Sequence, residues 1–301
     1  MIGIAIINYK TYKKTIECID SIKATIREPY RIYLLENGSP NESAEELEKK
    51  YNNDSCVKLI VSKTNEGYAR GNNICFRYMK QDNCEIGVVS NNDIICHNNT
   101  ISALIKNLKK DSSILLVGPK IISPEGKFQK SIQMEEIYGL KYLLYSSYIA
   151  KYIYRAKIRK DNKDALELKS LTEVAWVSGA FFAFSMKNME KIGYFDPKTF
   201  LFFEEKILAY KAKQYKMKLM YNPFVEVVHY HAYSTGGGLN IISKIAADQS
   251  ERYYFTKYIK SSKLFLILLS LQRIVEVVYS FGKRKDFIAI KKYIIEMRKG
   301  V

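Results

Sequence analysis

The sequence predicts an α/β fold, in which helices cover both faces of a mainly parallel sheet and a helical tail follows at the carboxyl end. Two observations lead to this prediction. Short apolar runs with the length of buried strands alternate with segments whose apolar residues recur every three or four positions, which is the spacing of one helix face. Strands that alternate with helices form parallel sheets, and such sheets bind ligands at the carboxyl ends of their strands.

The first 120 residues show this alternation without interruption. Residues 2–7 form the first expected strand, and the helix after it places Ile16, Ile19, Ile22 and Ile26 on one face. The later strands are short and apolar, and we expect them at 31–36, 57–61, 86–89 and 114–118. The helices between them share the helical spacing, and we expect them at 44–51, 72–79 and 100–108.

The second half of the chain is less regular. Residues 128–171 are rich in tyrosine and lysine without a strand period, so we expect an inserted helical region there. The elements expected after it are strands at 173–177 and 181–184, a helix from Glu204, and strands near Leu219 and at 225–229. No linker rich in Gly, Ser or Pro divides the chain before about residue 240, so residues 1–240 are predicted to form one domain.

Residues 241–301 form a tail of different character. Its most apolar run, residues 264–271, is followed by Arg273 and Glu276, so we expect no uninterrupted span of the roughly 20 residues that a transmembrane helix needs. Lysines and arginines flank the apolar faces, as in a basic amphipathic helix that lies on an anionic membrane surface. Helices that pack on the domain and turn their lysines to solvent explain the same pattern, and both interpretations stay open.

The charge balance and the cysteines limit the class of protein. Lysine and arginine number 48 and aspartate and glutamate 31, which gives a net charge of +17. An anionic partner would explain this charge, and so would a lysine-rich source proteome. The basic residues are spread along the chain without interleaved aromatic residues, so we expect no nucleic acid partner. The five cysteines include no Cys-x-x-Cys pair and the first apolar run is too short for a signal peptide, so reduced thiols in the cytoplasm are expected.

Polar residues follow several of the expected strands. Asp93 comes directly after the strand at 86–89, where a turn can hold phosphates and a divalent cation together, although an isolated aspartate of this kind more often caps a helix. Glu36 and Gly38 follow the second strand, and residues 65–73 supply small and amide side chains before a helix. Neither Gly-x-Gly-x-x-Gly nor Gly-Lys-Ser/Thr occurs, which argues against dinucleotide oxidoreductases and P-loop proteins.

Seven motifs follow one another in a characteristic order over residues 1–240. They are Ile6-Ile7-Asn8-Tyr9, Glu36-Asn37-Gly38-Ser39, Asn65-Glu66-Gly67 with Gly71-Asn72, Asn91-Asn92-Asp93, Trp176-Val177-Ser178-Gly179-Ala180, Gly193-Tyr194-Phe195-Asp196 through Phe203-Glu204-Glu205, and His229 followed by Ser234. This order resembles the family-2 inverting glycosyltransferases of GT-A fold, in particular their bacterial rhamnosyltransferase-like branch. The resemblance implies a Rossmann-like domain with a nucleotide-binding half at 1–120 and an acceptor-binding and catalytic half at 172–240.

The resemblance also implies which residues of the first half contact the donor. They are Asn8 and Glu36 at the nucleoside, Asn65, Gly67 and Asn72 at the sugar and phosphates, and Asn92 beside Asp93. Asp93 takes the place of the last carboxylate of the family's Asp-x-Asp motif, which holds Mg²⁺ or Mn²⁺ against the diphosphate of the donor. A hard cation of this kind would neutralise the leaving group and needs few protein ligands. The implied donor is a UDP- or dTDP-sugar.

In the second half, the resemblance implies that Glu204-Glu205 supplies the general base for the acceptor hydroxyl, with Glu205 as the first choice. Taken alone, two glutamates that begin a helix are explained by favourable charge at its N-terminus. His229 matches a family histidine that contacts the metal or a phosphate. His231 lies on the same face of the expected strand, and a hydrogen-bonded structural histidine is the alternative for either residue.

The implied acceptor residues are Gly179 and Ala180, which match the segment under the acceptor sugar, and Trp176, which would stack on a sugar face or pack in the core. The implied activity is transfer of a sugar to a lipid-linked or polysaccharide acceptor in bacterial surface glycan synthesis, at the inner face of the plasma membrane. Assembly with further copies of the chain stays open.

The chain departs from the family pattern near the glutamate pair. Ile207-Leu208 and Lys211 stand where Asp-Leu and an arginine are usual, and Glu205 replaces an aspartate. A non-catalytic nucleotide-sugar-binding partner in a glycan synthesis complex is therefore the alternative function.

Overall fold

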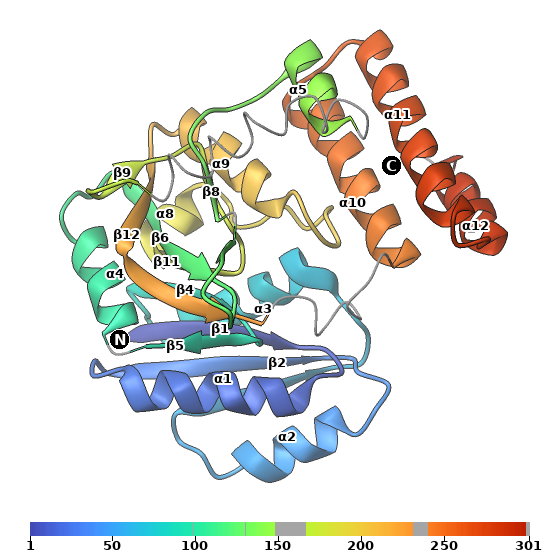
Figure 1. Ribbon diagram of the computed structural model, residues 1–301. Coiled ribbons are helices and arrows are strands. Elements are labelled where there is room, and N and C mark those ends of the chain that lie inside the picture. Colours follow the sequence, from blue (N-terminus) through green and yellow to red (C-terminus); the bar gives the residue numbers. More distant parts are fainter. Residues whose placement is uncertain (98, 130, 148–166, 231–239, 299–301) are drawn as a thin grey trace.

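The computed structural model describes residues 1–97, 99–129, 131–147, 167–230 and 240–298. A large, mainly parallel sheet forms the centre of the molecule, with helices on both faces and a group of helices from the carboxyl-terminal tail at one side (Figure 1). The predicted α/β fold is confirmed. His231, Ser234 and part of the expected insertion lie outside the described residues.

The sheet is ordered β3-β2-β1-β4-β11-β6-β12-β5. Its parallel strands are β1 (Ile2–Asn8), β2 (Tyr30–Asn37), β3 (Val57–Ser62), β4 (Ile86–Asn91), β6 (Ile114–Ile122) and β12 (Lys218–His229). Within this order, β11 (Phe181–Ser185) and β5 (Ile94–Cys96) run antiparallel to them. The two strands expected near Leu219 and at 225–229 are one strand, β12, which bulges between Asn222 and Glu226.

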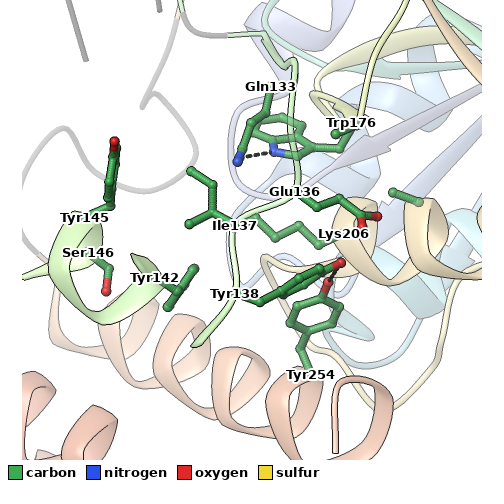
Figure 2. Close-up of a pocket in the computed structure, with 12 residues that line it drawn as sticks. Gln133, Glu136, Ile137, Tyr138, Tyr142, Tyr145, Ser146, Trp176, Lys206 and Tyr254 are labelled. Carbon is green, nitrogen blue, oxygen red and sulfur yellow. Dashed lines mark hydrogen bonds between the residues drawn. The ribbon is translucent and has the colours of Figure 1, made fainter. Parts of the chain in front are cut away.

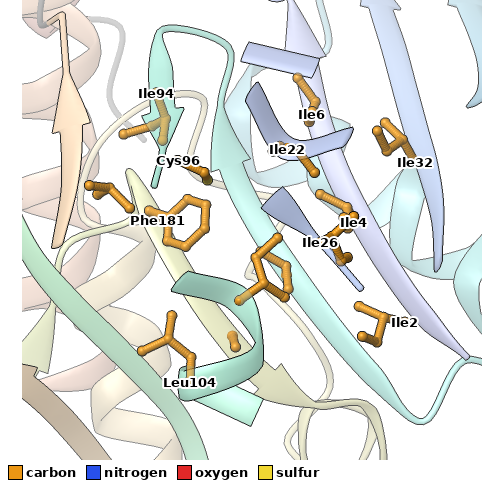
Figure 3. Packing of buried hydrophobic residues seen from close by; sticks show 14 of the residues in the cluster. Ile2, Ile4, Ile6, Ile22, Ile26, Ile32, Ile94, Cys96, Leu104 and Phe181 are labelled. Atoms are coloured by element: carbon orange, nitrogen blue, oxygen red, sulfur yellow. The ribbon is translucent and has the colours of Figure 1, made fainter. Parts of the chain in front are cut away.

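Successive side chains along each strand point to opposite faces of the sheet, so the core forms two layers, one on each face. Ile4 and Ile6 of β1 point into one layer, while Ala5 between them points into the other. The first layer, seen in Figure 3, lies under α1 (Tyr12–Thr25), α2 (Ser43–Tyr51) and α4 (Thr100–Leu108). The second lies under α3 (Gly67–Gln81), α8 (Met186–Lys191) and α9 (Glu204–Gln214).

The region expected to be an inserted helical segment begins instead as strands. β7 (Phe128–Gln129) pairs with β6, and β8 (Ile132–Gln133) pairs with β10 (Trp176–Val177). One helix, α5 (Gly139–Ser146), follows within the described residues. The single strand expected at 173–177 is two strands with different partners. β9 (Thr172–Glu173) pairs with β12, whereas β10 pairs with β8. These strands have two residues each, too few to show a period in the sequence.

The tail consists of helices that pack on the domain. They are α10 (Ile241–Tyr253), a π-helical turn η1 (Tyr254–Tyr258), α11 (Lys263–Gly282) and α12 (Phe287–Arg298). Phe255 and Phe265 of the tail share a buried cluster with Ile207 of α9 and Leu143 of α5. The tail therefore packs on the domain, and contact of its outer side with a membrane stays a prediction.

Helix α11 corrects the expectation that Arg273 and Glu276 would interrupt the apolar segment. It runs unbroken for 20 residues and is, among the described helices, the one with the length and apolar composition needed to cross a membrane. Arg273 does not end the helix because its side chain is buried against α10, where it pairs with Glu251. A sequence shows how many charges a segment carries, but not that a neighbouring helix neutralises them.

Candidate active site

The carboxyl ends of β1 and β2 hold a buried carboxylate. Glu36, which ends β2, accepts hydrogen bonds from Asn8 Nδ2 at 2.7 Å and from the backbone N–H and hydroxyl of Ser39 at 2.6 and 2.8 Å. Asn8 and Glu36 meet because β1 and β2 are parallel neighbours in register at these two residues. The structure thus brings together the two residues that the sequence placed at the nucleoside.

A chain of hydrogen bonds links this carboxylate to the turn after β4. Thr15 of α1 donates to Asn8 Oδ1 at 2.7 Å, and Asn92 Nδ2 donates to Thr15 Oγ1 at 2.9 Å and to Thr11 Oγ1 at 2.7 Å. Asn92 therefore fixes the turn against α1. Thr11 and Thr15 were missed in the sequence, where nothing distinguishes them from other threonines near the start of a helix.

Asp93 and His229 lie side by side at the end of this chain. The short strand β5 turns back along β12 and pairs Ile94 with His229, which brings Asp93 Oδ1 to 3.1 Å from His229 Nε2. Both side chains are buried. Gln129 Nε2 donates to the carbonyl of His229 at 2.8 Å, so its Oε1, 2.9 Å from His229 Nδ1, is positioned to accept the ring N–H. In the neutral ring this leaves the lone pair of Nε2 on the side of Asp93.

The loop before α3 and the first turns of this helix carry three of the residues expected at the donor. Asn65 Oδ1 accepts the backbone N–H of Gly67 at 2.9 Å, and Asn72, buried, donates to the carbonyl of Tyr68 at 3.0 Å. Gly67 has φ +75°, and a Cβ there would lie 2.4 Å from the carbonyl oxygen of Phe200. Only glycine allows this close approach between the loop and the segment that leads into α9. These contacts shape the loop and place it beside α9.

Glu204 and Glu205 begin α9, directly after two residues in left-handed conformation, Phe202 (φ 67°) and Phe203 (φ 66°). Non-glycine residues seldom adopt this conformation, and pairs of them mark a turn that its surroundings enforce. Glu204 is buried, and its Oε2 has no hydrogen-bond partner among the described residues. Glu205 is partly exposed. The helix N-terminus alone does not require a buried carboxylate, because an exposed one interacts with the helix dipole as well.

The two glutamates differ in their protonation. Burial and the adjacent Glu205 carboxylate raise the pKa of Glu204 well above its ordinary value of 4.5. Burial also raises the pKa of Glu205, but backbone N–H groups and Lys206 counteract it. Glu204 is therefore the carboxyl that stays protonated, and Glu205 is the one that ionises first.

Tyr68 connects this pair to the turn at Asp93. The Tyr68 N–H donates to the carbonyl of Phe200, in the segment that leads into α9, at 2.7 Å. Burial, then the carboxylates of Glu204 and Glu205, and further Asp93 raise the pKa of Tyr68 well above 10.0. The Tyr68 hydroxyl donates to the carbonyl of Gly179. Tyr68 was missed in the sequence because it lies inside the loop motif without a chemical pattern of its own.

The residues expected at the acceptor divide into two groups. Gly179 and Ala180 lie just before β11, between Tyr68 and the end of β4, where Asn91 N–H donates to the carbonyl of Ala180 at 2.8 Å. Trp176 forms the second group, and its Nε1 donates to Gln133 Oε1 at 2.8 Å (Figure 2).

Trp176 borders a pocket of about 240 Å³ between the domain and the tail. Its walls are aromatic and polar, and they come from α9 with Lys206 and Ala209, from β8 and α5, and from Tyr254 of η1 (Figure 2). The residues contributed by β8, α5 and the segment between them include Gln133, Glu136, Tyr138, Tyr142, Tyr145 and Ser146. Lys206 follows Glu205 directly, so the pocket adjoins the glutamate pair.

Asp93 and His229 fit a divalent cation. The described residues contain no cluster of three or more His, Cys, Asp or Glu side chains that could hold a metal ion by themselves. Asp93 Oδ1 is buried without a hydrogen bond within the described residues, and it faces an imidazole nitrogen. The carboxylate oxygen suits Mg²⁺ or Mn²⁺ when phosphate oxygens complete the coordination, and the neutral imidazole beside it can serve as a further metal ligand.

Solved structures share this architecture, which is that of the GT-A glycosyltransferases. The chain is similar to GalNAc-T7 with UDP, GalNAc and Mn²⁺, at a TM-score of 0.61 and 15% identity, and the match covers 86% of this chain and 49% of the other. This chain thus spans about half the length of GalNAc-T7. It is also similar to the mannosyltransferase PcManGT of Pyrobaculum calidifontis with GDP-Man and Mn²⁺, at a TM-score of 0.57 and 14% identity, covering 98% and 85% of the two chains.

The family model "Glycosyl transferase family 2" matches residues 3–193, so the chain belongs to glycosyl transferase family 2. A related sequence is the N-acetylglucosaminyl-diphospho-decaprenol L-rhamnosyltransferase of Mycobacterium tuberculosis. It is 23% identical over 245 residues, which are 78% of this chain and 77% of the relative. A glycosyltransferase of Acanthamoeba polyphaga mimivirus is 22% identical over 202 residues, covering 64% and 65%. The family expected from the motifs is confirmed, and the protein is a glycosyltransferase.

Proposed function

We propose that this glycosyltransferase moves a sugar from a UDP- or dTDP-sugar to a hydroxyl of a lipid-linked or polysaccharide acceptor, with inversion at the anomeric carbon. The observation that carries the proposal is that Tyr68 bridges two segments of the site. Its N–H donates to the carbonyl of Phe200, four residues before Glu204, and its hydroxyl donates to that of Gly179, next to Ala180, whose carbonyl accepts from Asn91 N–H. In this proposal a base for the acceptor and a carboxylate for the donor diphosphate belong to one site.

Glu205 acts as the general base in this proposal. It removes the proton from the acceptor hydroxyl while the hydroxyl oxygen forms a bond to the anomeric carbon and the bond from that carbon to the diphosphate oxygen breaks. The nucleoside diphosphate leaves on the face opposite the attack, so the anomeric centre inverts. Glu204 stays protonated, because the buried pair disfavours two negative charges.

Donor binding is assigned to the carboxyl ends of the strands. Asn8 orients Glu36, which accepts a hydrogen bond from the nucleoside in this proposal. The carboxylate can do so because it has more lone pairs than its partners within the protein use. Asp93 and His229 would hold Mg²⁺ or Mn²⁺, and the cation would supply positive charge that stabilises the leaving diphosphate. Asn92 and its threonine partners keep Asp93 in place.

The pocket beside Trp176 is proposed as the acceptor site. Aromatic rings suit the apolar faces of a sugar, and Gln133 and Glu136 supply hydrogen-bond partners for its hydroxyls. The mycobacterial relative is named for a diphosphate-linked lipid acceptor, which supports an acceptor of the same class here. All five cysteines are free thiols, which supports a location on the cytoplasmic side.

The departures from the family pattern have structural explanations, which weakens the non-catalytic alternative. Ile207 is buried in the cluster that α9 shares with the tail, so an apolar residue is needed there. Lys211 Nζ donates to the carbonyl of Tyr194 at 2.9 Å. This contact needs only one ammonium group, so a lysine can make it in place of the usual arginine.

The proposal is tested with Glu205→Gln and Glu204→Gln in a transfer assay over a panel of UDP-, dTDP- and GDP-sugars with Mn²⁺. We expect Glu205→Gln to lower kcat by about 10²–10⁴-fold, because an amide cannot accept the proton, and to keep donor affinity. Glu204→Gln is expected to keep most activity. If Glu204→Gln is the inactive variant, the roles of the two glutamates are reversed. If the parent binds a nucleotide-sugar but neither transfers nor hydrolyses it, the chain is a non-catalytic binding partner.

A further inference from the structure

The side of α11 that faces away from the domain is apolar and exposed. Its exposed residues are Leu264, Ile267, Leu268, Leu271, Val275, Val278 and Tyr279. They recur every three or four positions, so they form one continuous face of the helix. No charged residue lies on this face between its first and last members.

Beyond Lys263 at its start, the charged residues of α11, Arg273 and Glu276, lie on the opposite side. Arg273 makes a two-pronged pair with Glu251 of α10, in which Nε and Nη2 each donate to a carboxylate oxygen at 2.6 Å. Glu276 accepts from Arg273 at 3.2 Å and from Lys244 of α10 at 3.1 Å. These pairs hold α11 against α10 and leave its outer face to the surroundings.

Basic residues border the apolar face. The exposed ones are Lys263 at the start of α11, Lys283, Arg284 and Lys285 in the turn to α12, and Lys291, Lys292 and Arg298 on α12. Helix α12 also exposes Phe287, Ile288 and Ile295. The two helices lie next to each other at the edge of the molecule (Figure 1).

We propose that the outer face of α11, with α12, lies in the headgroup region of a bilayer that contains anionic phospholipids. An apolar centre with a basic border matches the apolar interior and negative surface of such a bilayer. A second copy of the chain fits less well, because a two-fold contact would bring the same basic border against itself.

The helices lie in the plane of the surface and do not span the bilayer. To span it, α11 would have to leave α10 and take Arg273 and Glu276 into the hydrocarbon without their partners. Charges at the centre of a bilayer cost free energy. Glu251 and Asp248, which would stay buried without Arg273, would cost further free energy.

The membrane face adjoins the proposed acceptor pocket. Helix α5, which lines the pocket with Tyr142, Tyr145 and Ser146, is held against α11 through Ser146, whose carbonyl accepts from Arg273 Nη1 at 3.0 Å. A lipid-linked acceptor could thus reach the pocket while its chain stays in the bilayer. This link rests on the proposed function, whereas binding to the membrane does not.

The test compares two double variants of the whole chain by sedimentation with vesicles of phosphatidylcholine and phosphatidylglycerol. Val275→Glu/Phe287→Glu alters the proposed face, where the side chains are 60% and 70% exposed. The control, Val61→Glu/Phe224→Glu, makes the same changes on the catalytic domain, at residues that are 58% and 73% exposed. All four positions are exposed, so circular dichroism should show folded protein in each case.

We expect the parent and the control to bind these vesicles equally, and Val275→Glu/Phe287→Glu to bind about tenfold or more weakly, since each apolar residue loses its burial in lipid. Added salt should weaken binding in part, and alkaline carbonate should extract the bound protein. The proposal fails if the parent does not bind anionic vesicles at low salt, or if both double variants bind alike. Resistance to carbonate would show a spanning helix. A dimer that dissociates only in Val275→Glu/Phe287→Glu, without vesicle binding, would assign the face to a second copy. None of these readouts depends on transfer activity.

Discussion

The residues around Asp93 leave one of its carboxylate oxygens buried and facing the imidazole of His229. The turn after β4 is fixed by Asn92, and the Gln129 contacts orient His229, so one buried oxygen of Asp93 faces an imidazole nitrogen without a hydrogen bond within the described residues. A buried carboxylate oxygen without a hydrogen bond costs free energy unless a cation or a proton occupies the space beside it. The residue is therefore better explained by a ligand than by stability.

We expect Asp93→Ala to abolish most of the Mn²⁺-dependent part of donor binding. Loss of one charged partner in a buried pair weakens binding by about 2–5 kcal/mol, which is at least about 30-fold. Calorimetric titration of the donor with Mn²⁺ and with EDTA measures this difference. Asp20→Ala, the same change at an exposed position of α1, serves as the control. An equal gain in affinity from Mn²⁺ in Asp93→Ala and the parent would rule out the proposed metal site.

At this scale, the sequence singled out candidate side chains through their motifs but not the residues that orient them. Asp93, Glu205 and His229 stand in motifs of recognisable order. Thr15, Tyr68 and Gln129 act through hydrogen bonds and charges to residues between 7 and 111 positions away. Contacts of this kind depend on the packing of strands and helices, which a single sequence does not show.

Helix α9 begins under strain, and this beginning positions the glutamate pair. Two consecutive residues with left-handed conformation cost of order 1 kcal/mol or more each. The loop before them is held by Tyr68 N–H, which donates to the carbonyl of Phe200 at 2.7 Å, and by Ser250 of α10, which donates to that of Leu201 at 3.0 Å. The surrounding elements thus enforce a helix start that local preferences disfavour.

We expect Glu204→Gln to stabilise the protein increasingly as pH rises. Because the pKa of Glu204 is raised in the folded state, the folded protein binds more protons than the unfolded chain above pH 4.5, so the stability of the parent falls as pH rises through the folded pKa. Each pKa unit is worth about 1.4 kcal/mol, and glutamine does not titrate. Melting temperatures between pH 4.5 and pH 8 measure the effect. Parallel curves for parent and variant would show that Glu204 is not perturbed.

Elements were predicted well where their apolar period is long. The strands β1, β2, β3, β4, β6 and β11 lie where they were expected. Helix α3 begins five residues before the predicted start, since Gly67 and Tyr68 are helical although their side chains show no period. The strands β5, β7 and β8 were missed because two or three residues carry no pattern, yet β5 is the element that brings Asp93 to His229.

At the scale of the whole molecule, the tail supports the catalytic half. Asp196, in the segment before α9, accepts hydrogen bonds from Tyr253 and Tyr258 of the tail, and Ile207 of α9 packs in the same cluster as Phe265. Since the tail shares buried contacts with the segment that positions Glu204 and Glu205, we infer that it unfolds together with the domain. The boundary near residue 240 divides the sequence by composition, but these contacts cross it.

We expect Arg273→Met to destabilise the whole protein by about 3–5 kcal/mol, because it keeps the volume but leaves Glu251 buried with less compensation. Trp176 is the only tryptophan, so its fluorescence reports on the pocket, while circular dichroism also reports on the tail helices. In urea, both signals should shift together to lower concentrations. Arg273→Met/Glu251→Met, which removes both charges, should recover part of the loss. If only the circular dichroism changes while the fluorescence midpoint of Arg273→Met stays that of the parent, the tail unfolds on its own and does not support the catalytic half.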